Sequence, residues 1–93
     1  MSRAGHNVRA AEGVLVKEMD GEAVLLDLAS ETYFGLDRTA FRIWTALTSR
    51  PTVEAALEDL AREYEVEGPA LAADVLALLD TLERKGLVRV GHA

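Results

Sequence analysis

The segment "LLDLASETYFGLD", Leu25 to Asp37, decides the fold, because a polar turn inside it joins two short apolar runs. Ala29 to Glu31 form the predicted turn, and Thr32 to Leu36 form the strand that follows it. Asp37 is well placed to cap a helix that starts at Arg38, because its carboxylate can accept hydrogen bonds from the first free amides. The segment therefore predicts a strand, a turn, a second strand and the start of a helix.

Upstream of this segment lies the clearest hairpin signal in the chain, "VLVKEMDGEAVLLDL". Asp20-Gly21 tolerates the positive φ angles of a tight hairpin turn, so strands are predicted at Val14–Met19 and Glu22–Leu28. Together with Thr32–Leu36 they form an antiparallel meander. Alternation divides the middle strand into two faces. The face predicted to meet the core carries Val24, Leu26 and Leu28, and the other carries Ala23, Leu25 and Asp27.

Three helices are predicted downstream of the meander. The first, "RTAFRIWTALTS", has an apolar stripe, and Thr52 is the expected N-cap of the second. The third runs from Pro69 to Lys85, with Gly86 as the residue that ends it. "LVRV" can form a short terminal strand. The fold class is therefore α+β: a three-stranded antiparallel sheet followed by three helices, similar to a winged helix-turn-helix.

The chain divides into an arm and one domain. Residues 1–13 mix glycine, alanine and charges without a period, so we predict a flexible N-terminal arm, with an early edge strand near Val8 as the alternative. Residues 14–90 are the predicted domain. Ninety-three residues are enough for a single modest core.

Composition excludes several classes of protein. A net charge of −6 opposes binding to phosphate backbones, so no nucleic-acid partner is expected. No cysteine is present for a disulfide or a thiolate metal site. No signal peptide or long apolar run occurs, and we expect a soluble, cytoplasmic protein with no membrane partner.

No catalytic or metal site is indicated. His6 and His92 lie in the terminal segments without a second ligand at suitable spacing, and no glycine-rich phosphate loop occurs. The serines lie in the arm or in turns, with no structured histidine to activate them. The sequence therefore predicts no enzyme activity, no metal and no cofactor.

Two features indicate binding of a peptide. The apolar arc of the third helix is wider than one small core should need, so one edge of it could stay uncovered. Thr32–Leu36 is an edge strand unless the arm or the tail pairs with it, and it carries no lysine or proline to discourage pairing. A free edge beside an apolar helix suits capture of an extended peptide as an added strand.

The order and spacing of these segments resemble the PqqD-like proteins, also called RiPP recognition elements. The resemblance covers roughly Val14 to Val90. Its points are "LLDLASETYFGLD", "A-x-x-I-W-x-x-L" in the first helix, "T-V-E-x-A" at the start of the second and "L-x-x-K-G-L-V" at the end of the third. The chain looks most like the free-standing members in lasso-peptide clusters. "TYFGLD" differs from the usual third-strand sequence of the member that serves quinone-cofactor biosynthesis. Peptide pathways other than lasso-peptide biosynthesis remain as alternatives.

The resemblance implies a function without catalysis. In such proteins the leader of a ribosomally made precursor peptide binds as an extra antiparallel strand on the third strand, in the groove beside the third helix. It also implies delivery of the precursor to a separate leader peptidase. Carried over to this chain, the strand residues are Thr32, Tyr33, Phe34, Gly35 and Leu36. The helical groove residues are Val75, Leu78, Leu79 and Leu82, with Asp74 or Thr81 as a polar anchor at the rim.

Two other functions remain as alternatives. A winged-helix DNA-binding protein would need a basic recognition helix, yet Ala70 to Glu83 contains three acidic residues and no lysine or arginine. The second alternative is an accessory subunit whose free strand edge packs permanently on an enzyme. Binding of an isolated leader peptide, without any enzyme, would distinguish a leader-binding protein from an accessory subunit.

Overall fold

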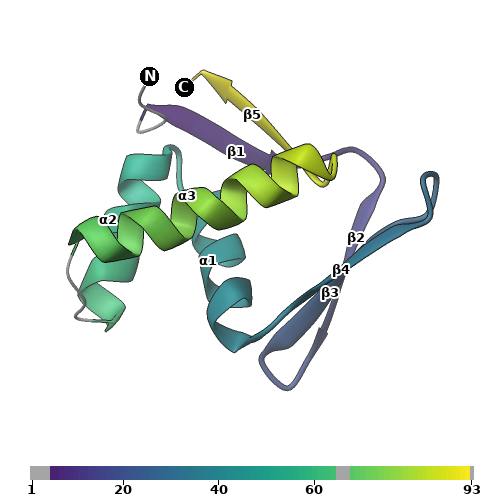
Figure 1. The fold of residues 1–93 in the computed structure, drawn as a ribbon, viewed down its shortest axis with the longest axis horizontal. Coiled ribbons are helices and arrows are strands. Elements are labelled where there is room, and N and C mark those ends of the chain that lie inside the picture. The colour runs from purple at the N-terminus through teal and green to yellow at the C-terminus, as the bar shows by residue number, and fades with distance from the viewer. Residues whose placement is uncertain (1–4, 65–67, 93) are drawn as a thin grey trace.

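The computed structural model describes residues 5–64 and 68–92, and it has the predicted α+β architecture (Figure 1). Four strands precede three helices, and a fifth strand follows them. The elements are β1 (His6–Ala10), β2 (Val14–Met19), β3 (Glu22–Asp27), β4 (Thr32–Leu36), α1 (Arg38–Ser49), α2 (Val53–Tyr64), α3 (Gly68–Arg84) and β5 (Val88–His92). The three-stranded antiparallel sheet and the three helices confirm the predicted fold class.

Strands β2, β3 and β4 form the antiparallel meander in that order. The turn between β2 and β3 has Asp20 at φ 54° and Gly21 at φ 84°, as a tight hairpin requires. Arg38 at the start of α1 donates to the Asp20 carbonyl over 3.1 Å, which ties the hairpin tip to the helix. β3 ends at Asp27, one residue before the predicted end, and Leu28 is exposed in the turn that follows.

The predicted core face of β3 is wrong. Ala23 and Leu25 are the buried residues, whereas Val24 and Leu28 are exposed. Strand β4 pairs Phe34 with Leu25 and Leu36 with Ala23, so the side chains of this face converge on the helices. Apolar residues occupy both faces of β3, and the register with β4 therefore decides which face is buried.

The two ends of the chain pair with each other in a separate two-stranded ribbon (Figure 1). β1 and β5 are antiparallel, with Val8 opposite Val90, and Val8 is 3% exposed within the core. The strand near Val8 is thus present, and residues 6–10 pack with the rest of the chain. The flexibility of residues 1–13 and the boundary at residue 14 stay predictions, and residues 1–4 lie outside the described residues.

The helices begin and end at the predicted signals. Asp37 accepts a hydrogen bond from the Ala40 amide at 2.8 Å, and Thr52 accepts one from the Ala55 amide at 3.1 Å. At the end of α3, Gly86 has φ 73°, and the Leu87 amide donates back to the Leu82 carbonyl at 3.0 Å. This is the hydrogen-bond pattern of a glycine-terminated helix.

Replacing Asp37 by alanine should lower the free energy of unfolding by about 1 kcal/mol, because the Ala40 amide loses its acceptor. Asp37→Asn is the matched control, since asparagine caps helices about as well as aspartate. Urea unfolding followed by circular dichroism measures both. Equal losses for the two variants would contradict a role in capping.

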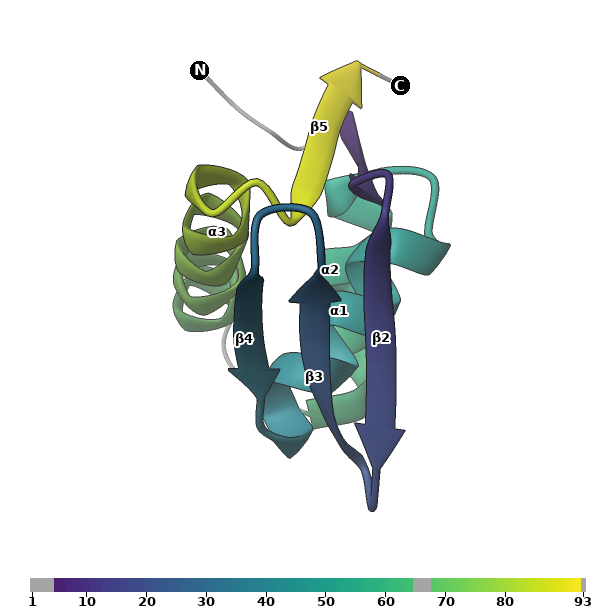
Figure 2. The same ribbon diagram turned by 90° about the vertical axis from the view of Figure 1, so that its right-hand side faces the viewer.

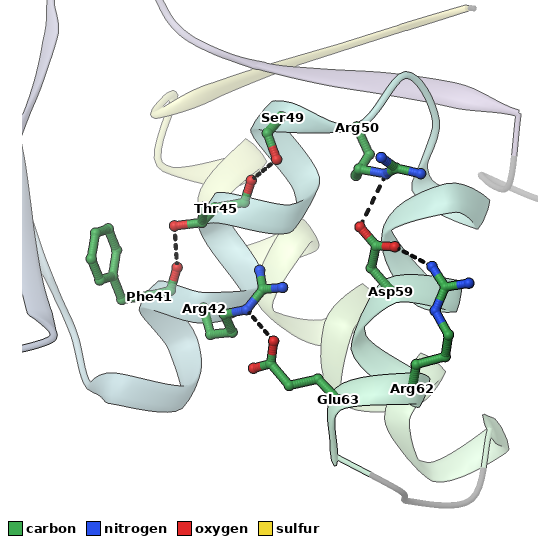
Figure 3. A network of polar contacts seen from close by, with 8 residues as sticks. All are labelled: Phe41, Arg42, Thr45, Ser49, Arg50, Asp59, Arg62 and Glu63. Atoms are coloured by element: carbon green, nitrogen blue, oxygen red, sulfur yellow. Dashed lines mark hydrogen bonds and ion pairs between the residues drawn. The ribbon is translucent and has the colours of Figure 1, made fainter.

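Helices α1 and α2 are joined on their outer faces by ion pairs (Figure 3). Arg42 meets Glu63 at 2.8 Å, while Asp59 lies 3.1 Å from Arg50 and 2.6 Å from Arg62. Because these groups are at the surface, each pair contributes little, about 0–1 kcal/mol.

The core lies between the three helices, the inner face of the meander and the ribbon. Leu25, Leu47, Leu60, Leu79 and Leu82 are among its fully buried side chains. No polar or charged residue is buried in the part of the chain that the structure describes. Within the same residues, none of the helices is long and apolar enough to cross a membrane.

Candidate functional site

The outer edge of β4 has no neighbouring strand among the described residues. The sheet order is β2-β3-β4, which makes β4 a terminal strand, and the ribbon strands β1 and β5 pair only with each other. The sequence left open whether the arm or the tail would cover this edge. Its outward amides and carbonyls are consequently available to an incoming strand.

Helix α3 lies alongside this edge, and its C-terminal end is close to the start of β4 (Figure 2). The ammonium of Lys85, just beyond α3, is 5.7 Å from the centre of the Phe34 ring, which connects the helix end with the strand. Such an arrangement is a favourable cation–π contact. Strand and helix thus form the two sides of the site.

The side chains of β4 alternate between the two faces of the sheet. Phe34 is half-buried and packs against the core, and Leu36 is 2% exposed. Tyr33, on the opposite face, is 73% exposed, and Gly35 shares that face. Thr32 at the beginning of the strand is half-buried. Only Phe34 and Thr32 can therefore offer side chains to a peptide on the helix side of the edge.

Helix α3 contributes fewer side chains to the site than the sequence predicted. Val75, Leu79 and Leu82 are each 0% exposed, so they belong to the core, and a peptide docking on this conformation cannot touch them. Their contact with a peptide stays a prediction, and in this structure the core covers all three. The apolar arc of α3 is wide because most of its side chains pack in the core.

Three predicted residues on α3 keep accessible surface. Leu78 is half-buried against the core, Asp74 is exposed and Thr81 is half-buried. The Thr81 hydroxyl donates to the Ala77 carbonyl at 3.1 Å, which leaves its oxygen free to accept. Spacings of four, three and four residues place Asp74, Leu78, Thr81 and Lys85 on one stripe of the helix. Since Lys85 reaches Phe34, this stripe faces β4.

Sequence reasoning missed two features around the site. Lys85 was assigned only to the helix end, although its contact with Phe34 places a cation at one end of the site. The open face of the meander also carries exposed apolar side chains, and of these Val24 was expected in the core. These are Leu15, Met19, Val24 and Tyr33. The misassigned face of β3 explains why this surface was not anticipated.

No metal-binding cluster was found in the part of the chain that the structure describes, since no three histidine, aspartate or glutamate side chains come together there as a metal site. The geometry offers backbone donors and acceptors, half-buried apolar surface and one lysine. These groups can hold an extended polypeptide in a fixed register.

Two solved structures resemble this chain closely. The first, "TbiB1 in Complex with the TbiA(beta) Leader Peptide", is 36% identical with a TM-score of 0.79, over 91% of this chain and 98% of the other. The second, "Lasso peptide synthetase B1 complexed with the leader peptide", is 30% identical with a TM-score of 0.80, over 89% of this chain and 98% of the other. The comparison with curated proteins returned no match.

The family comparison agrees with the resemblance seen in the sequence. The family model described as coenzyme PQQ synthesis protein D (PqqD) matches residues 22–88, from the start of β3 to the start of β5. The matched segment contains β4 and α3, which form the two sides of the candidate site. The chain therefore belongs to the PqqD family.

Proposed function

We propose that this protein binds the leader region of a ribosomally synthesised precursor peptide, of the lasso-peptide type. The observation that carries the proposal is the free edge of β4 beside the half-buried side chains of Phe34 and Leu78. Both solved relatives are complexes with leader peptides, which supports the same class of ligand for this chain. The protein acts by recognition and performs no chemistry itself.

The leader adds to β4 as a fourth, antiparallel strand of the meander. Backbone hydrogen bonds along Thr32 to Leu36 supply affinity for any extended chain, and the apolar side chains set the register. Phe34 and Leu78 receive apolar leader side chains between strand and helix. Asp74 and Thr81 offer polar partners along the same stripe of α3.

Delivery of the bound precursor to a separate leader peptidase completes the proposed function. Adding a strand to the edge of β4 leaves the open face of the meander uncovered, so a second protein can still approach the complex. The winged-helix alternative gains no support, because α3 turns its fully buried residues Val75, Leu79 and Leu82 to the core and has no lysine or arginine between Ala70 and Glu83.

Backbone methylation of the leader tests this binding geometry. The probe is a synthetic leader of about 20 residues from the precursor encoded beside this gene, with one N-methyl group moved along it. In an antiparallel ladder, alternate amides point to the neighbouring strand. Methylation at every second position should therefore weaken binding about tenfold or more, because a buried hydrogen bond is lost.

Isothermal titration calorimetry gives the affinity of each methylated peptide. The positions between the sensitive ones serve as internal controls, because their amides point away from β4. Sensitivity that recurs every three or four residues would indicate a helical leader and contradict strand addition. An unmethylated leader that does not bind at all would overturn the proposed function itself.

A further inference from the structure

Two arginines stand directly opposite each other on the ribbon of β1 and β5. Arg9 and Arg89 are register partners, and both side chains are exposed. Val8, one residue earlier, is buried in the core, so the alternation of the strand places Arg9 on the outer face of the ribbon. Like charges directly opposite each other on paired strands are destabilising, which makes this pair costly for the isolated protein.

Neither arginine has an anionic partner in the described part of the chain. Among the described residues, no ion pair or side-chain hydrogen bond involves either one, whereas Arg42, Arg50 and Arg62 pair with Glu63 or Asp59. Both arginines line a hollow of about 480 Å³, together with Gly86, Val88 and their neighbours. Glu83 also lines it, and this residue takes part in a further interaction.

The hollow lies where a bound leader would leave β4. An antiparallel leader runs from the Leu36 end of β4 towards the Thr32 end, which lies close to the C-terminal end of α3 (Figure 2). Arg89 follows Lys85 by four residues, a span of at most about 14 Å of extended chain. The leader segment that follows the paired part would therefore run towards the residues that line the hollow.

We infer that the Arg9 and Arg89 hollow binds carboxylate side chains in the leader segment that follows the strand-pairing part. The inference rests on the proposed function and adds that this part of the leader carries negative charge. The planar guanidinium groups suit carboxylates, since each can donate two parallel hydrogen bonds. A bound carboxylate also neutralises the repulsion between Arg9 and Arg89.

The test combines two peptides with two proteins. One peptide is the leader encoded beside this gene, and in the other every Asp and Glu is replaced by Asn or Gln. The variant R9Q/R89Q removes both cations of the hollow. The wild-type protein should bind the encoded leader about fivefold more tightly than its neutral version, as two exposed ion pairs allow. The variant should bind both peptides equally.

The double variant R50Q/R62Q is the charge-matched control, because it removes two cations from the network of α1 and α2 (Figure 3). It should keep the preference for the encoded leader. Thermal unfolding of R9Q/R89Q should show no loss of stability, because the substitution removes a like-charge pair. Salt at 0.5 M should reduce the wild-type preference, since ion pairs at the surface are screened.

The outcomes separate this inference from the proposed function. If R9Q/R89Q binds the encoded leader as tightly as wild type, or if the control loses the preference equally, the inference is overturned and leader binding stands. An encoded leader without any carboxylate beyond its strand-pairing part also overturns it. If the encoded leader does not bind the wild-type protein, both proposals fall.

Discussion

Leader binding should be lost, by at least about 100-fold in affinity, when Leu78 is replaced by aspartate. Leu78 is half-buried on the stripe of α3 that faces β4, so the proposed site places an apolar leader side chain against it. A carboxylate there would lose its hydration when the peptide docks, which costs several kcal/mol without a partner. Calorimetry with the encoded leader measures the loss. The same variant should fail to accelerate cleavage of the precursor by the leader peptidase.

Leu76→Asp is the matched control, because Leu76 is 39% exposed and lies two residues away, on another side of the helix. Its affinity for the leader should stay near that of wild type. Circular dichroism checks that both variants fold. Leu78→Ala, which adds no charge, should weaken binding by roughly tenfold, in line with lost apolar contact. If Leu78→Asp unfolds while Leu78→Ala binds normally, Leu78 is a core residue and not a contact.

Replacing Leu79 by alanine should have the opposite consequence, namely a large loss of stability with little change in affinity. Leu79 is 0% exposed in the core, and truncation of such a leucine costs about 2–5 kcal/mol. For a domain of this size the loss corresponds to a fall in Tm of at least about 8 °C. Thermal unfolding followed by circular dichroism measures it.

The comparison of Leu79→Ala with Leu76→Ala separates core from surface on the same helix. The Leu76 variant should lose less than about 1 kcal/mol, because its side chain is partly exposed already. Affinity for the leader should be measured well below the Tm of each variant. A marked fall in affinity for folded Leu79→Ala would place Leu79 in the binding site, as the sequence alone had suggested.

Local chemistry made much of this fold predictable. The Asp20-Gly21 turn, the caps at Asp37 and Thr52 and the glycine end at Gly86 depend on residues close together in the chain. Each is decided by backbone hydrogen bonds or by a positive φ, which few residue types satisfy. The meander and the helix boundaries follow from these positions.

The buried faces were harder to predict because they depend on partners far apart in the sequence. β3 is apolar on both faces, and only its register with β4 brings Ala23 and Leu25 against the helices. The same holds for α3, where the core takes Val75, Leu79 and Leu82 and leaves Leu78 half-buried. The free edge of β4 depends in turn on the pairing of β1 with β5, which joins His6 to His92.

That pairing also fixes where the two ends of the molecule leave it. Because His6 and His92 are opposite each other in the ribbon, the first and last strands of the described chain end side by side (Figure 1). The hairpin tip at Asp20-Gly21 lies at the far end of β2 and β3 (Figure 2). A fluorophore, a surface tether or a fused enzyme attached at either terminus would therefore occupy the ribbon end. The Leu36 end of β4 lies away from this ribbon, so a label placed at the ribbon should not cover that end of the strand (Figure 2).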